Sequence, residues 1–179
     1  MFSVYKEPKV IHNFLTNEQC EYLINDTSGE FTPTKFTSTV DTNQGIRSMS
    51  KRVSKSIDVL KSICKKCTRV VDLPIENFED FLLIKYEKGG FTGKHQDGGT
   101  GGNTNRLYTF LFALNDDYEG GETKFEFLNK MYKLKKGDAL FFHNFNNDGS
   151  STKLSVHEGC IVKSGQKFIC NTWIRNVIT

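Results

Sequence analysis

The sequence has no long apolar stretch, which excludes a helix that crosses a membrane. Its 179 residues contain no run close to the ~18 consecutive apolar residues that such a helix needs. The chain begins Met-Phe-Ser-Val-Tyr-Lys-Glu-Pro, without the continuous apolar segment and small-residue cleavage site of a secretory signal. We therefore expect a cytoplasmic protein without a membrane partner.

A strong excess of charge of either sign is also missing. Lysine and arginine together number 24, aspartate and glutamate 21, and the formal net charge is +3. Domains that bind nucleic acid usually carry a larger positive charge gathered on one face. The composition therefore argues against a nucleic-acid partner.

Alanine is scarce, and the number of cysteines is odd. The chain has only two alanines but many Asn, Lys and Phe residues, a bias typical of AT-rich coding in many protists and large DNA viruses, so the expected compartment is a host cytoplasm.

Without a secretory signal, the five cysteines predict reduced thiols. Cys64 and Cys67 form a C-x-x-C that lacks the second pair or nearby histidine of a zinc site. We interpret them as buried core thiols, with a redox role as the alternative.

The first eighty residues mix helix and strand signals. Thr16 and Gln19 have the spacing of a capping box, which predicts a helix as far as Ile24, after a short strand over residues 10–14. Residues 31–40 are rich in Thr, Phe and Val and predict a strand. From about residue 48 to 68 the apolar positions recur at helical spacing, which predicts a long amphipathic helix.

After Pro74, short apolar or alternating runs are separated by turns rich in glycine and asparagine. They predict strands over residues 81–86, 107–114, 123–127, 131–134, 139–142, 154–162 and 167–174. Such a series is typical of a sandwich or barrel. The expected fold class is mostly β with α (α+β): one domain over residues 1–179, with a double-stranded β-helix (jelly-roll) barrel from about residue 81. The helices of residues 1–80 would pack outside it, and we expect a monomer.

Four histidines are candidates for metal binding: His12, His95, His143 and His157. His95 and Asp97 are two residues apart, so they lie on the same side of an extended chain. A second histidine from a distant strand would complete a face of two histidines and one carboxylate, which leaves three positions of an octahedral iron open. The H-x-D triplet alone is a weak signal, because a surface histidine near an aspartate is common.

The residues around this triplet resemble the prolyl 4-hydroxylase family of 2-oxoglutarate- and Fe(II)-dependent dioxygenases. In that family a strand ending in Tyr-x-x-Gly leads into the H-x-D, as residues 81–97 do here. Further blocks follow in the family's order at residues 105–106, 110–115, 119–123, 135–142, 147–149, 155–160 and 165–174. Residues 10–24 resemble its opening strand and helix more loosely. Several blocks in the right order are far more specific than any one of them.

The resemblance implies two sets of site residues. The expected iron ligands are His95, Asp97 and His157. The residues expected to hold 2-oxoglutarate are Lys167, Tyr86, Thr123 and Trp173. Since Lys167 and Trp173 are six residues apart on one strand, both can point into the same interior. A dianion in a low-dielectric barrel needs such a fixed cation, with neutral donors in place of water. His143, beside an asparagine-rich turn, is the rival third ligand, and His12 is interpreted as an ordinary strand residue.

Three arginines are weaker candidates for substrate contact: Arg47, Arg106 and Arg175. Arg106 resembles the family's substrate-contacting arginine. The Arg47 segment resembles the family's Arg-x-Ser but lacks the aromatic residue that follows, and Arg175 stands where the family often has a basic residue or histidine. We expect the glycine-rich loop of residues 98–105, together with the Arg47 segment, to close over a bound peptide.

The implied reaction uses Fe(II), 2-oxoglutarate and O2, with ascorbate supporting activity. It would hydroxylate a prolyl residue in a peptide or protein and release succinate and carbon dioxide. Asp97 argues against the halogenase branch, in which a small residue vacates that position. Two alternatives stay open: a related oxygenase acting on another amino-acid side chain or a nucleobase, and a jelly-roll binding module that has lost turnover. The complete set of candidate ligands argues against the second.

Overall fold

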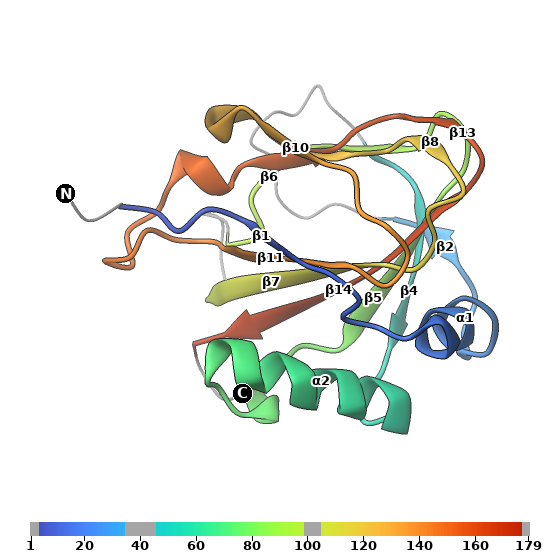
Figure 1. The fold of residues 1–179 in the computed structure, drawn as a ribbon, viewed down its shortest axis with the longest axis horizontal. Helices are drawn as coiled ribbons and strands as arrows, with labels where there is room; N and C mark the ends of the chain where they lie inside the picture. Colours follow the sequence, from blue (N-terminus) through green and yellow to red (C-terminus); the bar gives the residue numbers. More distant parts are fainter. Residues whose placement is uncertain (1–3, 35–45, 99–104, 177–179) are drawn as a thin grey trace.

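Two antiparallel sheets face each other in the structure, a computed structural model that describes residues 4–34, 46–98 and 105–176 (Figure 1). The larger sheet contains, in spatial order, β1 (Lys9–Ile11), β11 (Ala139–His143), β7 (Arg106–Ala113), β14 (Lys167–Arg175), β5 (Phe81–Tyr86), β4 (Met49–Val53) and β2 (Thr32–Pro33). The smaller sheet contains β10 (Lys130–Tyr132), β9 (Thr123–Phe125), β12 (His157–Gly159), β6 (Phe91–His95) and β3 (Ile46–Arg47). A short pair, β8 (Glu119–Gly120) with β13 (Val162–Ser164), lies at one end of both sheets.

The chain alternates between the two sheets as it advances. β5, β7, β11 and β14 belong to the larger sheet, whereas β6, β9 and β12, which come between them in the sequence, belong to the smaller one. Such alternation winds the strands into a double-stranded β-helix, the jelly-roll architecture that the strand pattern predicted. The fold class is therefore confirmed.

The space between the two sheets is filled by alternate residues of the strands. Ile84 and Ile169 of the larger sheet and Phe125 of the smaller one belong to a single buried cluster. The rings of Phe125 and Phe142 meet edge to face across this interior, with centroids 5.1 Å apart. The even-numbered neighbour Cys170 belongs instead to the cluster on the outer face of the larger sheet. This alternation lets one strand serve both the barrel interior and the helical layer.

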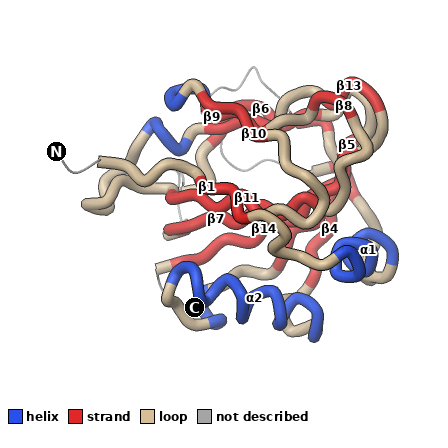
Figure 2. Tube along the Cα trace, in the orientation of Figure 1, coloured by secondary structure: helices blue, strands red, loops and turns tan. Residues whose placement is uncertain are grey.

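Two helices, α1 (Asn17–Asn25) and α2 (Asp58–Val71), cover the outer face of the larger sheet. Figure 2 shows them in blue on one side of the strands. The predicted capping box begins α1, with the Gln19 amide donating to the Thr16 hydroxyl at 3.2 Å and the Thr16 amide to the Gln19 side chain at 3.1 Å. Leu60 and Ile63 of α2 are fully buried and pack in the cluster that contains Phe112. Short single turns of 3-10 helix follow α2 and precede β10 and β12: η1 (Ile75–Asn77), η2 (Glu126–Leu128) and η3 (Lys153–Ser155).

The helix predicted from about residue 48 is wrong at its start. Residues 49–53 form β4, which pairs with β5 so that Val53 lies opposite Phe81, and α2 begins only at Asp58. Lys51 and Val53 are buried while Arg52 between them is exposed, which is a strand pattern. Pairing with β5 therefore decides the conformation here, against the helical spacing of the apolar residues. The run at 154–162 likewise divides into η3, β12 and β13, and most of the strand expected at 31–40 lies outside the described residues.

Four of the five cysteines are buried and all five are free thiols. Cys64 and Cys67 lie on the inner face of α2, and burial raises the pKa of Cys64 to about 12. In the described residues no cysteine belongs to a group of side chains close enough to hold a metal. Cys64 and Cys67 are core thiols, as the helical spacing predicted.

The described helices include none that is long and apolar enough to pass through a bilayer.

Candidate active site

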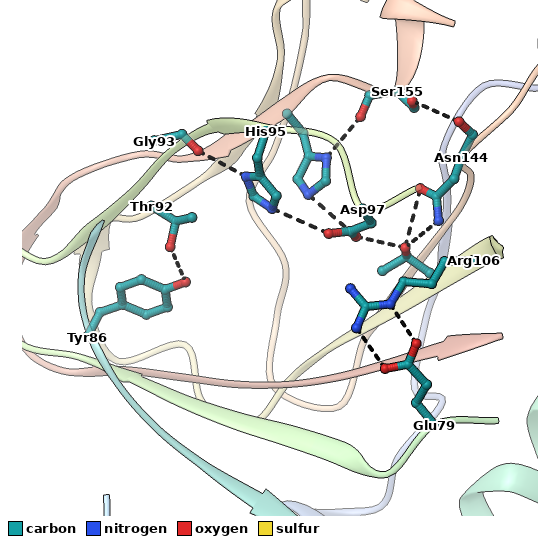
Figure 3. A network of polar contacts seen from close by, with 11 residues as sticks. Glu79, Tyr86, Thr92, Gly93, His95, Asp97, Arg106, Asn144 and Ser155 are labelled. Atoms are coloured by element: carbon teal, nitrogen blue, oxygen red, sulfur yellow. Dashed lines mark hydrogen bonds and ion pairs between the residues drawn. The ribbon is translucent and has the colours of Figure 1, made fainter. Parts of the chain in front are cut away.

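Three potential metal ligands meet at one end of the barrel interior. His95 ends β6, Asp97 follows two residues later, and His157 begins β12, directly opposite His95 in the pairing of the two strands. One ligand atom from each of the three lies within 4.8 Å of the others (Figure 3). Within the described parts of the chain this is the one such group. The strand pairing therefore brings together His95 and His157, which are 62 residues apart in the sequence.

Backbone carbonyls fix the orientation of both imidazoles. The Nδ1 of His95 lies 2.9 Å from the carbonyl oxygen of Gly93, and the Nδ1 of His157 lies 2.9 Å from that of Ser155. A carbonyl can only accept, so each Nδ1 carries a hydrogen, and each Nε2 is the nitrogen available to a metal. The Nε2 atoms lie 3.4 Å and 3.8 Å from the two oxygens of Asp97. All three side chains thus present ligand atoms to the same point.

The protonation states suit a divalent cation. Burial, and then the charge of His95, lower the pKa of His157 to about 4, so its imidazole is neutral at neutral pH. Burial opposes ionisation of Asp97, but both histidines and the Thr109 hydroxyl outweigh it and hold the pKa of that carboxyl below its usual value. Burial lowers and Asp97 raises the pKa of His95, and the net direction is upward. A metal that binds here meets an ionised carboxylate and displaces at most a proton from His95.

The two other histidines lie elsewhere. His143 is on the opposite face of β11 from Phe142, and its ring packs against Tyr108 with centroids 4.9 Å apart. It is Phe142 that approaches His157, at 4.9 Å. His12 contacts Asp138 at 3.2 Å and is largely exposed. Strand parity therefore excludes His143 as the third ligand.

A narrow pocket continues the interior away from the three ligands. It is lined by Leu111, Ala113, Tyr118, Gly121, Thr123, Tyr132, Leu134, Lys167 and Ile169. Its single cationic group is Lys167, which is 3% exposed and donates to the carbonyl of Gly121 at 2.7 Å. A side chain on Gly121, which has φ +67, would meet the Cδ of Lys167 at 3.1 Å, so glycine is needed for this close approach.

Lys167 forms no ion pair within the described parts of the chain. Among the residues that the structure describes, no carboxylate oxygen lies within 4.0 Å of its ammonium group. Burial, and then the charge of Lys133, lower the pKa of Lys167 to about 8. A buried cation beside neutral hydroxyl groups and apolar walls is complementary to the carboxylate of an elongated anion. The lining of this pocket therefore has the chemistry that binding of 2-oxoglutarate requires.

Tyr86 and Trp173 lie on the same face of the larger sheet as Lys167, and their contact with 2-oxoglutarate stays a prediction. Tyr86 is paired with Lys167 in the register of β5 and β14, its ring centroid lies 5.1 Å from the ammonium, and its hydroxyl is 2.9 Å from that of Thr92. Burial raises the pKa of Tyr86 to about 12, so the phenol stays protonated. Trp173 is on the same face of β14 as Lys167 and is 6% exposed, and its Nε1 has no hydrogen-bond partner among the residues that the structure describes. The Oδ1 of Asn171, between them on that face, is also unpaired. These orphaned polar atoms indicate that the interior accommodates a polar ligand.

Two of the three candidate substrate arginines bind a carboxylate of the protein itself. Arg106 donates to both oxygens of Glu79, at 2.6 and 2.7 Å, and its guanidinium lies 3.9 Å from the ring centroid of Trp173. Arg175 donates to the same carboxylate at 2.8 Å. Arg47 is exposed on β3, next to Phe91 of β6. Two of the three arginines thus already donate hydrogen bonds to Glu79. Substrate contact by any of the three stays a prediction. Residues 99–104, the core of the predicted covering loop, lie outside the described residues.

Several residues of the site escaped the sequence analysis. Thr109, Asn144 and Ser155 support the metal ligands through hydrogen bonds, and Glu79 holds the two arginines. The alternation of a strand shows which face of the sheet a polar residue lies on, but it does not show what that residue contacts. For Thr109 the one available clue was parity, because a polar residue falls among the apolar residues of β7.

The chain is similar to known proteins over nearly its whole length. Residues 81–175 match the model of the 2OG-Fe(II) oxygenase superfamily. A putative prolyl 4-hydroxylase of Acanthamoeba polyphaga mimivirus is 30% identical over 96% of this chain and 75% of its own, and prolyl 4-hydroxylase 1 of Arabidopsis thaliana is 31% identical over 95% and 69%. The crystal structure of a viral collagen prolyl hydroxylase from Paramecium Bursaria Chlorella virus-1, in complex with 2OG, superposes with a TM-score of 0.76 at 28% identity and covers 96% of this chain and 97% of that one.

Proposed function

This chain belongs to the 2OG-Fe(II) oxygenase superfamily, and from that premise we propose that it hydroxylates prolyl residues within a peptide or protein. It is a 2-oxoglutarate-dependent dioxygenase of the prolyl 4-hydroxylase type, with Fe(II) and 2-oxoglutarate as cofactors. The observation that carries this conclusion is that the His95, Asp97 and His157 group shares the barrel interior with a buried lysine, which contacts no carboxylate among the described residues.

Each part of the site has a separate task. His95, Asp97 and His157 would hold Fe(II) on one face, which leaves the remaining coordination positions for co-substrate and O2. When bound, Fe(II) would allow O2 to oxidise 2-oxoglutarate to succinate and carbon dioxide, so that one oxygen atom enters succinate and the other enters the substrate.

The protein supplies binding and orientation. The Lys167 ammonium and the hydroxyl of Thr123, which both line the pocket, would bind the distal carboxylate. Tyr86, beside Lys167 in the register, would add a neutral donor. The apolar walls of the barrel exclude water, which strengthens these interactions and protects the oxidising reaction from side reactions.

A prolyl substrate is favoured by the relatives. Proteins named prolyl 4-hydroxylases match this chain over more than 90% of its length. Proline-rich segments adopt an extended polyproline conformation, which needs little ordering to enter an open site. Action in a host cytoplasm, support by ascorbate and a monomeric state stay predictions.

The test is a peptide panel. The purified protein is loaded with Fe(II) and 2-oxoglutarate without oxygen, mixed with O2, and assayed for succinate and for the mass of each peptide. Paired peptides differ only by replacement of proline with alanine. We expect proline-dependent succinate and a mass gain of one oxygen atom on proline.

Matched histidine variants provide the control. His157→Ala removes a proposed ligand, whereas His143→Ala removes an imidazole from the outer face of the barrel. Only the first should abolish turnover. If alanine peptides are oxidised as well as proline peptides, or if a different side chain or a nucleobase gains the oxygen, the prolyl assignment is wrong and the related-oxygenase alternative applies.

A further inference from the structure

A chain of buried hydrogen bonds ends on the carboxylate of Asp97. The hydroxyl of Thr109 donates to Asp97 Oδ2 at 2.8 Å, and the side-chain amide of Asn144 donates to that same hydroxyl at 3.0 Å (Figure 3). Thr109 is 1% exposed, Asn144 is 2% exposed and Asp97 is 7% exposed. Water therefore has little access to replace any of these donors.

The side-chain amide of Asn144 determines which group donates in each of these hydrogen bonds. The Thr109 hydroxyl has one hydrogen, and the nearer contact with Asn144 is one in which the amide nitrogen donates. The hydroxyl oxygen thus accepts from Asn144, and its hydrogen is left for Asp97. A hydrogen bond to a carboxylate that is itself reinforced by a second donor is stronger than an isolated one.

Both supporting residues are rigidly placed. Thr109 is in the middle of β7, paired with Phe142 of β11 on one side and Trp173 of β14 on the other. The backbone amide of Asn144 donates to the carbonyl of Leu107 at 2.9 Å. The larger sheet therefore holds the donors from both sides.

The same hydrogen-bond network also reaches His157, the ligand on β12. The hydroxyl of Ser155 lies 3.1 Å from the carbonyl of Asn144 and donates to it, and the carbonyl of Ser155 holds the Nδ1 of His157. The side chain of Gln96, between the first two ligands, donates to the Ser155 hydroxyl at 3.2 Å. The segments that carry His157 and Asp97 are thus tied to each other through Asn144.

We propose that Thr109 and Asn144 are positioning residues that keep Asp97 a one-oxygen ligand. The Thr109 hydroxyl bonds to Oδ2 and fixes the rotation of the carboxylate, which favours Oδ1 as the oxygen that binds the metal. A carboxylate free to rotate would bind through both oxygens and take up a position that the co-substrate needs. This inference concerns the metal ligand and does not depend on the substrate being a prolyl peptide.

The test compares Thr109→Val, Thr109→Ser and a matched control. Valine keeps the shape of threonine and removes the donor, whereas serine keeps the hydroxyl. Thr172→Val is the control, because Thr172 is a fully buried threonine on the neighbouring strand β14 whose hydroxyl donates to the Glu79 carbonyl, away from Asp97. Each variant is titrated with Fe(II) and with Co(II) under anaerobic conditions, in competition with a chromophoric chelator. The Fe(II) form is then titrated with 2-oxoglutarate and followed by its charge-transfer absorption.

Thr109→Val should bind both metals about 10–100-fold more weakly than the unaltered protein, the usual effect of losing a group that supports a metal ligand. It should also need more 2-oxoglutarate to reach the same absorption. Thr109→Ser should restore most of both properties, and Thr172→Val should change neither. Wild-type metal affinity in Thr109→Val would overturn the proposal, as would an equal loss in the serine or Thr172→Val variant.

The role of Asn144 is tested by a double-mutant cycle. Asn144→Leu should weaken metal binding less than Thr109→Val, because the threonine hydroxyl remains but loses its orientation. Added to Thr109→Val, it should cause little further loss, since the two act in series. Losses that add in full would show that Asn144 does not act through Thr109.

Discussion

Replacement of Lys167 by methionine should weaken 2-oxoglutarate binding without destabilising the protein. Methionine matches the length of the lysine stem and removes the charge. Since the ammonium is the one cation of the pocket, the distal carboxylate would lose its counter-charge. Removing one partner of a buried ion pair costs about 3–5 kcal/mol, so half-saturation by 2-oxoglutarate should rise more than tenfold.

The stability of the protein without co-substrate should change little or increase. Burial lowers the pKa of Lys167 from 10.5 to about 8, which corresponds to roughly 3 kcal/mol of folding free energy lost by keeping the lysine charged at neutral pH. Methionine removes that cost but leaves the Gly121 carbonyl without its donor, a loss of about 1–3 kcal/mol. The net gain is therefore about 0–2 kcal/mol.

The pH dependence gives a second signature. Between pH 8 and 10.5 the unfolded chain binds more protons at this lysine than the folded protein, so the stability of the unaltered protein rises with pH relative to Lys167→Met. Over the same range its affinity for 2-oxoglutarate should fall, because the neutral amine no longer attracts the carboxylate. The variant should show neither trend.

The assays are a 2-oxoglutarate titration at saturating Fe(II), read by succinate, and thermal unfolding without cofactors. Lys51→Met is the matched control: Lys51 is also buried, with a pKa lowered by burial, but its ammonium donates to the Thr27 carbonyl outside the pocket. An unchanged half-saturation in Lys167→Met, or an equal rise in Lys51→Met, would refute the reasoning. Lys167→Arg is not expected to rescue, because its planar guanidinium differs in length and shape from an ammonium.

Three further predictions follow from the site. Fe(II) at about 100 times its dissociation constant should stabilise the protein by about 2.7 kcal/mol, and His157→Ala, but not His143→Ala, should remove this shift in thermal unfolding. Tyr86→Phe should raise half-saturation by 2-oxoglutarate about tenfold or less, because one neutral hydrogen bond contributes about 1 kcal/mol; an effect as large as that of losing the buried cation would contradict its secondary role. Glu79→Gln should destabilise the protein at neutral pH. Burial raises the pKa of Glu79, but Arg106 and Arg175 outweigh it and lower that pKa below 4.5, so this stabilisation is present above 4.5 and is lost on acidification. Denaturant unfolding at two pH values should show that the difference between variant and parent shrinks in acid.

Much of the barrel was predictable, because strand periodicity indicates where a strand lies and which of its residues share a face. The range 81–86 predicted for β5 matches the structure, and the parity that placed Lys167 and Trp173 on one face of β14 is confirmed. The ligand set was predictable for a different reason. His95 and Asp97 are local in sequence, and the order of family blocks selected His157 over His143.

The rest depends on contacts that a one-dimensional pattern does not contain. β4 is a strand because it pairs with β5, although its apolar residues also fit a helix. Glu79 holds Arg106 and Arg175 only because β7 and β14 place the two arginines side by side. Thr109 and Asn144 are 35 residues apart and meet only across the β7–β11 pairing, so their support of Asp97 has no sequence signature.

The central claim is that this chain couples the oxidation of 2-oxoglutarate to that of a second substrate at the His95, Asp97 and His157 group. The most direct measurement is turnover under isotopically labelled O2, with mass analysis of the succinate and of the peptide. We expect one labelled oxygen atom in succinate and labelled oxygen in the hydroxylated peptide, both absent in Asp97→Ala. Succinate without label, or labelled product formed equally well by Asp97→Ala, would contradict the claim.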